Sequence, residues 1–116
     1  ETKPSESELQ CCWSIININN GKHIFHNLIT YMNDRVLYRQ RWVKVLQQSN
    51  ISLGLINGSV DPVSGQHMVQ RYNELECRLD FIAQLPNIGH YPQVEAPAEV
   101  LKHYLIFLSR FEKTAN

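Results

Sequence analysis

The first half of the chain has the apolar spacing of amphipathic helices. Between residues 23 and 46, apolar side chains recur at steps of three and four residues, which is the period of a helix with one buried face. Asn33 and Asp34 weaken this pattern, which then resumes on a slightly different face. It is therefore compatible with one helix or with two helices that meet near residues 33–38. A shorter helix is expected over Glu6–Ile16.

The second half alternates the patterns of strands and helices. The run Ile51–Asn57 is short, apolar and bounded by turn residues, which is typical of a strand buried on both faces. In Leu79–Leu85, apolar residues alternate with polar ones, as in a second strand. Ser64 stands at the N-cap position of a helix between these strands. A strand, a crossover helix and a strand form a right-handed parallel βαβ unit, so the chain is predicted to belong to the α/β class.

A final helix is expected to begin near Pro97, because proline suits the first turn of a helix. It carries an apolar stripe made of Val100, Leu101, Tyr104, Leu105, Leu108 and Phe111. Two strands are too few to bury both faces of a sheet, so the sheet is expected to be incomplete. The chain also starts with ETKPSESE and without Met, so we expect it to be a piece of a longer protein.

Composition and charge narrow the classes of function. The chain has 116 residues and a mass of 13.5 kDa, which is enough for at most one domain of ordinary size. Eleven Lys and Arg residues balance eleven Asp and Glu residues and are scattered along the chain, so no nucleic-acid binding is expected. No apolar run approaches the roughly 20 residues that a membrane span needs, so no membrane-spanning segment is expected.

Few residues suggest a disulfide, a metal or a cofactor. Cys11, Cys12 and Cys77 are odd in number and lack a Cys-x-x-Cys spacing, which favours a reducing, cytoplasmic location. His23 and His26 are three residues apart in a predicted helix, but no third metal ligand is visible near them in the sequence. We therefore expect neither a metal nor a cofactor.

Two ionisable residues follow the two predicted strands. In open α/β sheets, functional residues lie in the loops at the carboxyl ends of the strands. Asp61 lies in the loop after the first strand and His90 in the loop after the second, so the two side chains are able to meet. An Asp that orients a His is two thirds of a triad of nucleophile, base and acid. Alternatively, Asp61 before Pro62 is a turn former and His90 an ordinary loop residue.

The motifs around these residues resemble the C-terminal portion of the α/β-hydrolase superfamily. LINGSVDPV at residues 55–63 looks like the acid loop of that family, and GHYPQVEAPAEV at residues 89–100 looks like its histidine loop and final helix. RQRWV at residues 39–43 and HYPQ at residues 90–93 are similar to the branch that contains haloalkane dehalogenases, epoxide hydrolases and mesoderm-specific transcript proteins.

This resemblance implies an organisation and a function. Residues 1–46 would be the end of a helical cap domain, and residues 47–116 would be the C-terminal βαβα part of the hydrolase core. Asp61 would be the orienting acid of a catalytic triad, and His90 would be its general base.

The chain departs from the family because the nucleophile is missing. None of the elbow motifs Gly-x-Ser-x-Gly, Gly-x-Asp-x-Gly and Gly-x-Cys-x-Gly occurs in the 116 residues. The sequence therefore does not determine whether the nucleophile is a Ser, an Asp or a Cys. Ser59 and Ser64 are near Asp61 in sequence, but neither stands on a strand-to-helix elbow opposite His90. We therefore expect part of a hydrolase, inactive alone, that acts on a small-molecule substrate once an upstream half completes it.

A different class of function is also compatible with the sequence. The chain would then be a catalytically silent, truncated homologue or an interaction module. The strand Ile51–Asn57 would have an exposed edge where a further core strand should pair, and such an edge suits self-association.

Overall fold

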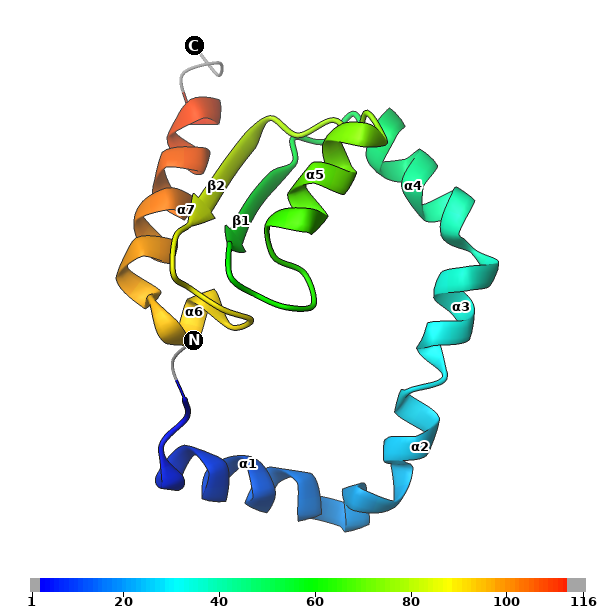
Figure 1. Ribbon diagram of the computed structural model, residues 1–116, viewed down its shortest axis with the longest axis vertical. Helices are drawn as coiled ribbons and strands as arrows, with labels where there is room; N and C mark the ends of the chain where they lie inside the picture. The colour runs from blue at the N-terminus through cyan, green and yellow to red at the C-terminus, as the bar shows by residue number, and fades with distance from the viewer. Residues whose placement is uncertain (1–2, 113–116) are drawn as a thin grey trace. The chain divides into compact units, whose positions relative to one another are not determined.

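The computed structural model describes residues 3–112, with the backbone alone for Phe111 and Glu112 (Figure 1). Two compact units divide this range, residues 3–42 and residues 43–112. The first contains the helices α1 Glu6–Asn17, η1 Ile18–Ile24, α2 Phe25–Leu28 and α3 Tyr31–Leu37, and the start of α4 Arg39–Gln48; η1 is a 3₁₀ helix. The second contains the rest of α4, β1 Gly54–Gly58, α5 Gln66–Glu74, β2 Phe81–Leu85, α6 Pro92–Glu95 and α7 Pro97–Glu112. The predicted domains 1–46 and 47–116, whose outer ends lie outside the described residues, stay a prediction.

α1 agrees with the helix that the sequence predicts over Glu6–Ile16. It begins with a capping box, in which the Ser5 hydroxyl accepts the Glu8 N–H at 3.3 Å and the Glu8 carboxylate accepts the Ser5 N–H at 2.7 Å. The Ser5 hydroxyl and N–H both donate to this carboxylate and hold the pKa of Glu8 below its ordinary value. The capping box therefore fixes the start of the helix.

The helical region predicted over residues 23–46 is a series of short helices. The expected break is present at Tyr38, but a second break at Thr30 was not predicted. The Thr30 hydroxyl donates to the Asn27 carbonyl at 2.6 Å, and such a bond competes with the helical pattern. None of residues 3–42 is buried, so no packing within this unit enforces one continuous helix.

β1 and β2 lie side by side as parallel strands, with Gly54 paired to Phe81 and Gly58 paired to Leu85 (Figure 1). α5 connects the two strands, and the predicted α/β class is confirmed. The prediction that the first strand is buried on both faces is wrong, because only its last two residues, Asn57 and Gly58, are buried. β2 is also covered on one face only, because Phe81, Ala83 and Leu85 are buried whereas Ile82 and Gln84 are exposed.

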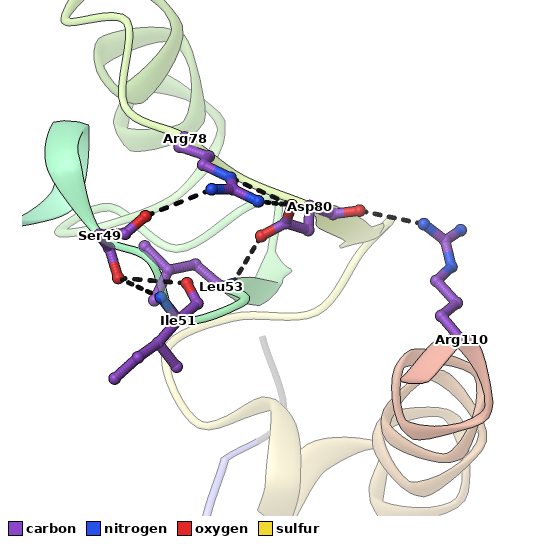
Figure 2. Close-up of polar contacts among 6 residues, drawn as sticks. All are labelled: Ser49, Ile51, Leu53, Arg78, Asp80 and Arg110. Atoms are coloured by element: carbon purple, nitrogen blue, oxygen red, sulfur yellow. Dashed lines mark hydrogen bonds and ion pairs between the residues drawn. The ribbon is translucent and has the colours of Figure 1, made fainter. Parts of the chain in front are cut away.

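Asp80, just before β2, binds residues near the start of both strands and in α7 (Figure 2). Its carboxylate accepts the Leu53 N–H at 2.9 Å and lies 3.3 Å from the Arg78 guanidinium. Arg110 of α7 donates to the Asp80 carbonyl at 3.0 Å. The bond from Leu53 and the charge of Arg78 hold the pKa of Asp80 below its ordinary value, against the effect of burial. Both strands begin later than the sequence predicts, at Gly54 and at Phe81.

α7 packs on the sheet with a face other than the predicted stripe. Two rings of α7 pack near the Phe81 ring of β2: the centroid of Phe107 lies 5.8 Å from the centroid of Phe81, and the centroid of His103 lies 6.2 Å from it. Of the predicted stripe, Val100 is half-buried and the Phe111 side chain lies outside the described residues. The other four residues, which we call the α7 stripe, are exposed: Leu101, Tyr104, Leu105 and Leu108. Leu101 is 56% exposed. Apolar residues thus occupy more of this helix than two strands can cover.

Candidate active site

Backbone contacts join the loops that follow β1 and β2. The Ser59 N–H donates to the Leu85 carbonyl at 3.0 Å, and the Val60 N–H donates to the Ile88 carbonyl at 3.1 Å. Gly58 lies so close to the second loop that a Cβ atom there would be 2.7 Å from the Ile88 carbonyl oxygen. The carboxyl ends of the two strands therefore form one continuous edge.

Asp61 and His90 meet at this edge, as the sequence analysis expected. The Nδ1 atom of His90 lies 2.8 Å from the Oδ2 atom of Asp61. The Asp61 side chain is only 3% exposed, whereas the His90 side chain is 38% exposed. The pair thus joins an interior carboxylate to an imidazole that solvent reaches.

Hydrogen-bond donors surround the Asp61 carboxylate. The Ser64 hydroxyl donates to Oδ2 at 2.5 Å, and the Val63 N–H donates to Oδ1 at 2.8 Å. Burial raises the pKa of Asp61, but the bonds from Ser64, Val63 and His90 outweigh it and hold this pKa well below its ordinary value. The carboxylate is therefore ionised at neutral pH and can only accept hydrogen bonds.

The ionised carboxylate determines the tautomer of the neutral His90 ring. Because Asp61 only accepts, the hydrogen bond between them requires the ring proton on Nδ1. Nε2 is then without a proton and is able to act as a base. The Tyr91 ring packs edge-on against the imidazole, with centroids 4.8 Å apart. A histidine held in this way has the arrangement of a general base with its orienting acid.

Ser64 does not cap α5, so this prediction is wrong. The helix begins at Gln66 with Gly65 as the N-cap and without a side-chain cap bond. The Ser64 hydroxyl is instead bound to Asp61. A serine just before a helix looks the same in both roles, so the sequence could not separate them. Since its hydroxyl partner is the carboxylate and not His90, Ser64 lacks the contact that a nucleophile makes with its base.

Asn57 is a buried polar residue that the sequence analysis did not single out. It ends the apolar part of β1, and its Nδ2 donates to the Ser64 carbonyl at 2.5 Å. Its Oδ1 is buried and has no hydrogen-bond partner among the described residues. The available signal was a polar residue at the end of an apolar strand. Asn57 thereby ties β1 to the loop that carries Asp61.

The remaining candidates do not form a site. His23 and His26 are exposed, and within residues 3–112 no three His, Cys, Asp or Glu side chains are grouped to hold a metal ion. His67 is exposed and lies 3.0 Å from the Val63 carbonyl oxygen. In the same range, no helix combines the length and the apolar character that crossing a membrane requires.

Comparison with known proteins finds relatives that are similar to most of this chain in sequence. The chain is 33% identical to the mouse mesoderm-specific transcript protein and 35% identical to its human homologue, each over 111 residues, or 95% of this chain. It is 37% identical to the Mycobacterium tuberculosis protein named "Putative hydrolase LipZ" over 93 residues, or 80% of this chain. These matches cover 33% of each mesoderm-specific transcript protein and 32% of LipZ, so the chain spans about a third of the length of the curated relatives it matches.

No protein-family model and no solved structure matches the chain. The relatives nevertheless cover most of it, and the mesoderm-specific transcript protein is an α/β-hydrolase family member. The chain is therefore related to the α/β-hydrolases.

Proposed function

We propose that the chain carries the acid and the histidine of an α/β-hydrolase catalytic triad, and that the nucleophile lies outside these 116 residues. The observation that carries this proposal is the 2.8 Å contact between His90 and the buried Asp61 carboxylate, where two parallel strands end. The similarity to a protein named as a hydrolase supports it. In this proposal Asp61 is the orienting acid and His90 is the general base.

The step that His90 performs depends on the nucleophile. With a serine or cysteine, Nε2 takes its proton as the oxygen or sulfur attacks the substrate, and later gives that proton to the leaving group. With an aspartate, the carboxylate attacks a carbon of the substrate and forms an ester, while the carbon–halogen bond breaks to release a halide ion or an epoxide C–O bond breaks to leave an alkoxide that takes up a proton. His90 then takes a proton from the water that hydrolyses this ester. In each case Asp61 stabilises the imidazolium that forms. The substrate would be a small ester, epoxide or alkyl halide.

Residues 3–42 would belong to the end of a helical cap domain of the complete hydrolase. Their helices are amphipathic, yet no residue in this unit is buried. Val36, for example, is 82% exposed. Apolar helix faces of this kind suit a layer that covers a substrate or packs on a further part of a protein.

A chimaera tests this proposal. The chain would replace the matched third of LipZ, and turnover of p-nitrophenyl acetate and styrene oxide would be measured. We expect the chain alone to be inactive and the chimaera to hydrolyse one of these compounds. His90→Ala in the chimaera should abolish turnover. His67→Ala should preserve it, since the His67 ring is hydrogen-bonded to the Val63 carbonyl, whereas Asp61 is bound to His90. Turnover by the 116-residue chain that His90→Ala abolishes would show that the nucleophile lies within it.

The second candidate function is a catalytically silent interaction module. The observation that favours it is the two-stranded sheet, in which β1 and β2 each have one edge that no other described strand pairs. The α7 stripe adds an exposed apolar surface. A chimaera that folds and whose residual turnover is insensitive to His90→Ala would favour this function over the hydrolase.

A further inference from the structure

The loop that carries His90 is bound on both sides by one carboxylate. Glu95 is the last residue of α6, and its Oε2 accepts the Gly89 N–H at 3.0 Å. Its Oε1 accepts the Tyr91 N–H at 3.2 Å. The two carboxylate oxygens therefore bind the backbone N–H groups immediately before and after His90.

The local fold brings Glu95 back to this loop. α6 is a single turn with Pro92 at its start, and the Glu95 N–H donates to the Tyr91 carbonyl at 2.9 Å. This turn places the Glu95 side chain beside the segment that precedes it. Hydrogen bonds to an ionised carboxylate are stronger than those between neutral groups, so two of them restrain a short loop effectively.

The rest of the site shows why such a restraint matters for His90. Asp61 is buried and fixed by Ser64 and Val63, so its position does not adapt to a displaced imidazole. His90 is part exposed and has the edge of the Tyr91 ring as its aromatic neighbour. Packing alone therefore leaves the imidazole free to turn toward solvent, and the direction of its Cα–Cβ bond depends on the backbone at residues 89–91.

We propose that Glu95 is a positioning residue, which aims His90 at Asp61 by holding the N–H groups on both sides of the histidine. The role rests on the proposed function, because it matters for chemistry only if His90 is the general base. The arrangement itself is a property of the chain and can be measured without any activity.

The test is ¹⁵N nuclear magnetic resonance of the His90 ring in the full 116-residue chain, at a pH where the imidazole is neutral. The unmodified chain should give the Nδ1–H tautomer, with a downfield proton from the bond to Asp61. Asp61→Ala, which removes the acceptor, gives the reference for a lost bond. In Glu95→Ala we expect the Nδ1 proton to exchange with water about tenfold faster, because a bond to a charged group contributes roughly that factor to a local equilibrium. Glu95→Gln keeps one acceptor oxygen, so its Nδ1 proton should exchange at a rate between those of the unmodified chain and Glu95→Ala.

Glu74→Gln is the matched control, because Glu74 is exposed and pairs with Arg71 on α5. It should leave the His90 signals unchanged. If Glu95→Ala lowers the melting temperature but leaves the tautomer and the exchange rate of His90 unchanged, Glu95 is merely structural and the proposal fails. Unfolding of both Glu95 variants would overturn it as well, since Glu95 would then support the whole unit. An inactive chimaera would contradict the proposed function and leave these ring signals as they are.

Discussion

Gly58, the last residue of β1, packs directly against the carbonyl oxygen of Gly89, the residue before His90. This contact brings the acid loop and the histidine loop within hydrogen-bonding distance of each other. A side chain at residue 58 would have to push the two loops apart. We therefore expect the pairing of Asp61 with His90 to depend on the glycine three residues before the acid.

Gly58→Ala should destabilise the second unit and separate Asp61 from His90. The added methyl group would overlap two backbone carbonyls, and overpacking of this kind costs about 1–3 kcal/mol. Gly54→Ala, in the same strand, is the matched control, because its Cβ atom would meet the Phe107 ring at 3.0 Å and a side chain can shift. Urea unfolding measures both free energies. Equal losses of stability would contradict a special role for the Gly58 contact.

The Asp61–His90 pair could be predicted because it depends on topology alone. Parallel strands end at the same edge, so the residues that follow them are neighbours whatever the packing elsewhere. Ser64 could not be predicted in the same way, since its contact with Asp61 depends on the path of the loop. Glu95 was missed for the same reason: the single turn of α6 was not predicted, and only this turn brings its carboxylate to the loop.

Ser64→Ala should raise the pKa of Asp61. The Ser64 hydroxyl donates to the carboxylate, and a donor favours the ionised form, so removing it makes protonation easier. The carboxyl ¹³C resonance of Asp61, followed against pH, measures this change. Ser59→Ala in the same loop is the control, because Ser59 contributes its backbone to the hydrogen bonds there. An unchanged titration of Asp61 in Ser64→Ala would contradict the assignment of this bond.

The stability of the chain should fall in acid. Asp61 and Asp80 have pKa values below the ordinary 3.8 in the folded chain, so both groups bind protons more readily when unfolded. Their contribution is fully present above pH 3.8 and is lost as the pH falls through the lowered pKa values. Asp61→Asn should be less stable than the unmodified chain at pH 7 and should lose less stability between pH 5 and pH 2. Urea unfolding of the two chains at pH 7 and between pH 5 and pH 2 measures these free energies. Equal losses of stability in the two chains between pH 5 and pH 2 would refute the prediction.

Asp80→Ala should destabilise the second unit more than Arg78→Ala. Removal of the carboxylate leaves the Leu53 N–H without its acceptor at the start of β1, whereas removal of Arg78 breaks an ion pair that is half-exposed (Figure 2). Thermal unfolding of the two variants and of the double variant tests this order. A larger effect of Arg78→Ala would mean that the ion pair, and not the bond to Leu53, holds the strands at this end.

The order of elements could be read from the sequence, but the packing of the helices could not. Apolar periodicity predicts which residues are able to be buried. Which of them are buried depends on the elements that pack against them. In α7 the apolar residues extend over more than one face, and the face with His103 and Phe107 lies on the sheet. In residues 3–42 no partner layer is present within the unit, so the periodic pattern yields short helices with exposed apolar side chains.

The exposed apolar surface of α7 predicts that the chain associates with itself. Tyr104 and Leu105 in the α7 stripe are 49% and 54% exposed, and contiguous apolar patches of this kind mark interaction surfaces. Because association stabilises only the folded form, the melting temperature should rise with protein concentration. The double variant Leu101→Glu, Leu105→Glu should remove this dependence. Lys102→Glu also alters charge on α7 but lies outside the stripe, so it should leave the dependence intact. A cooperative transition of a monomer, independent of concentration in the unmodified chain, would show that these surfaces do not bind a second copy.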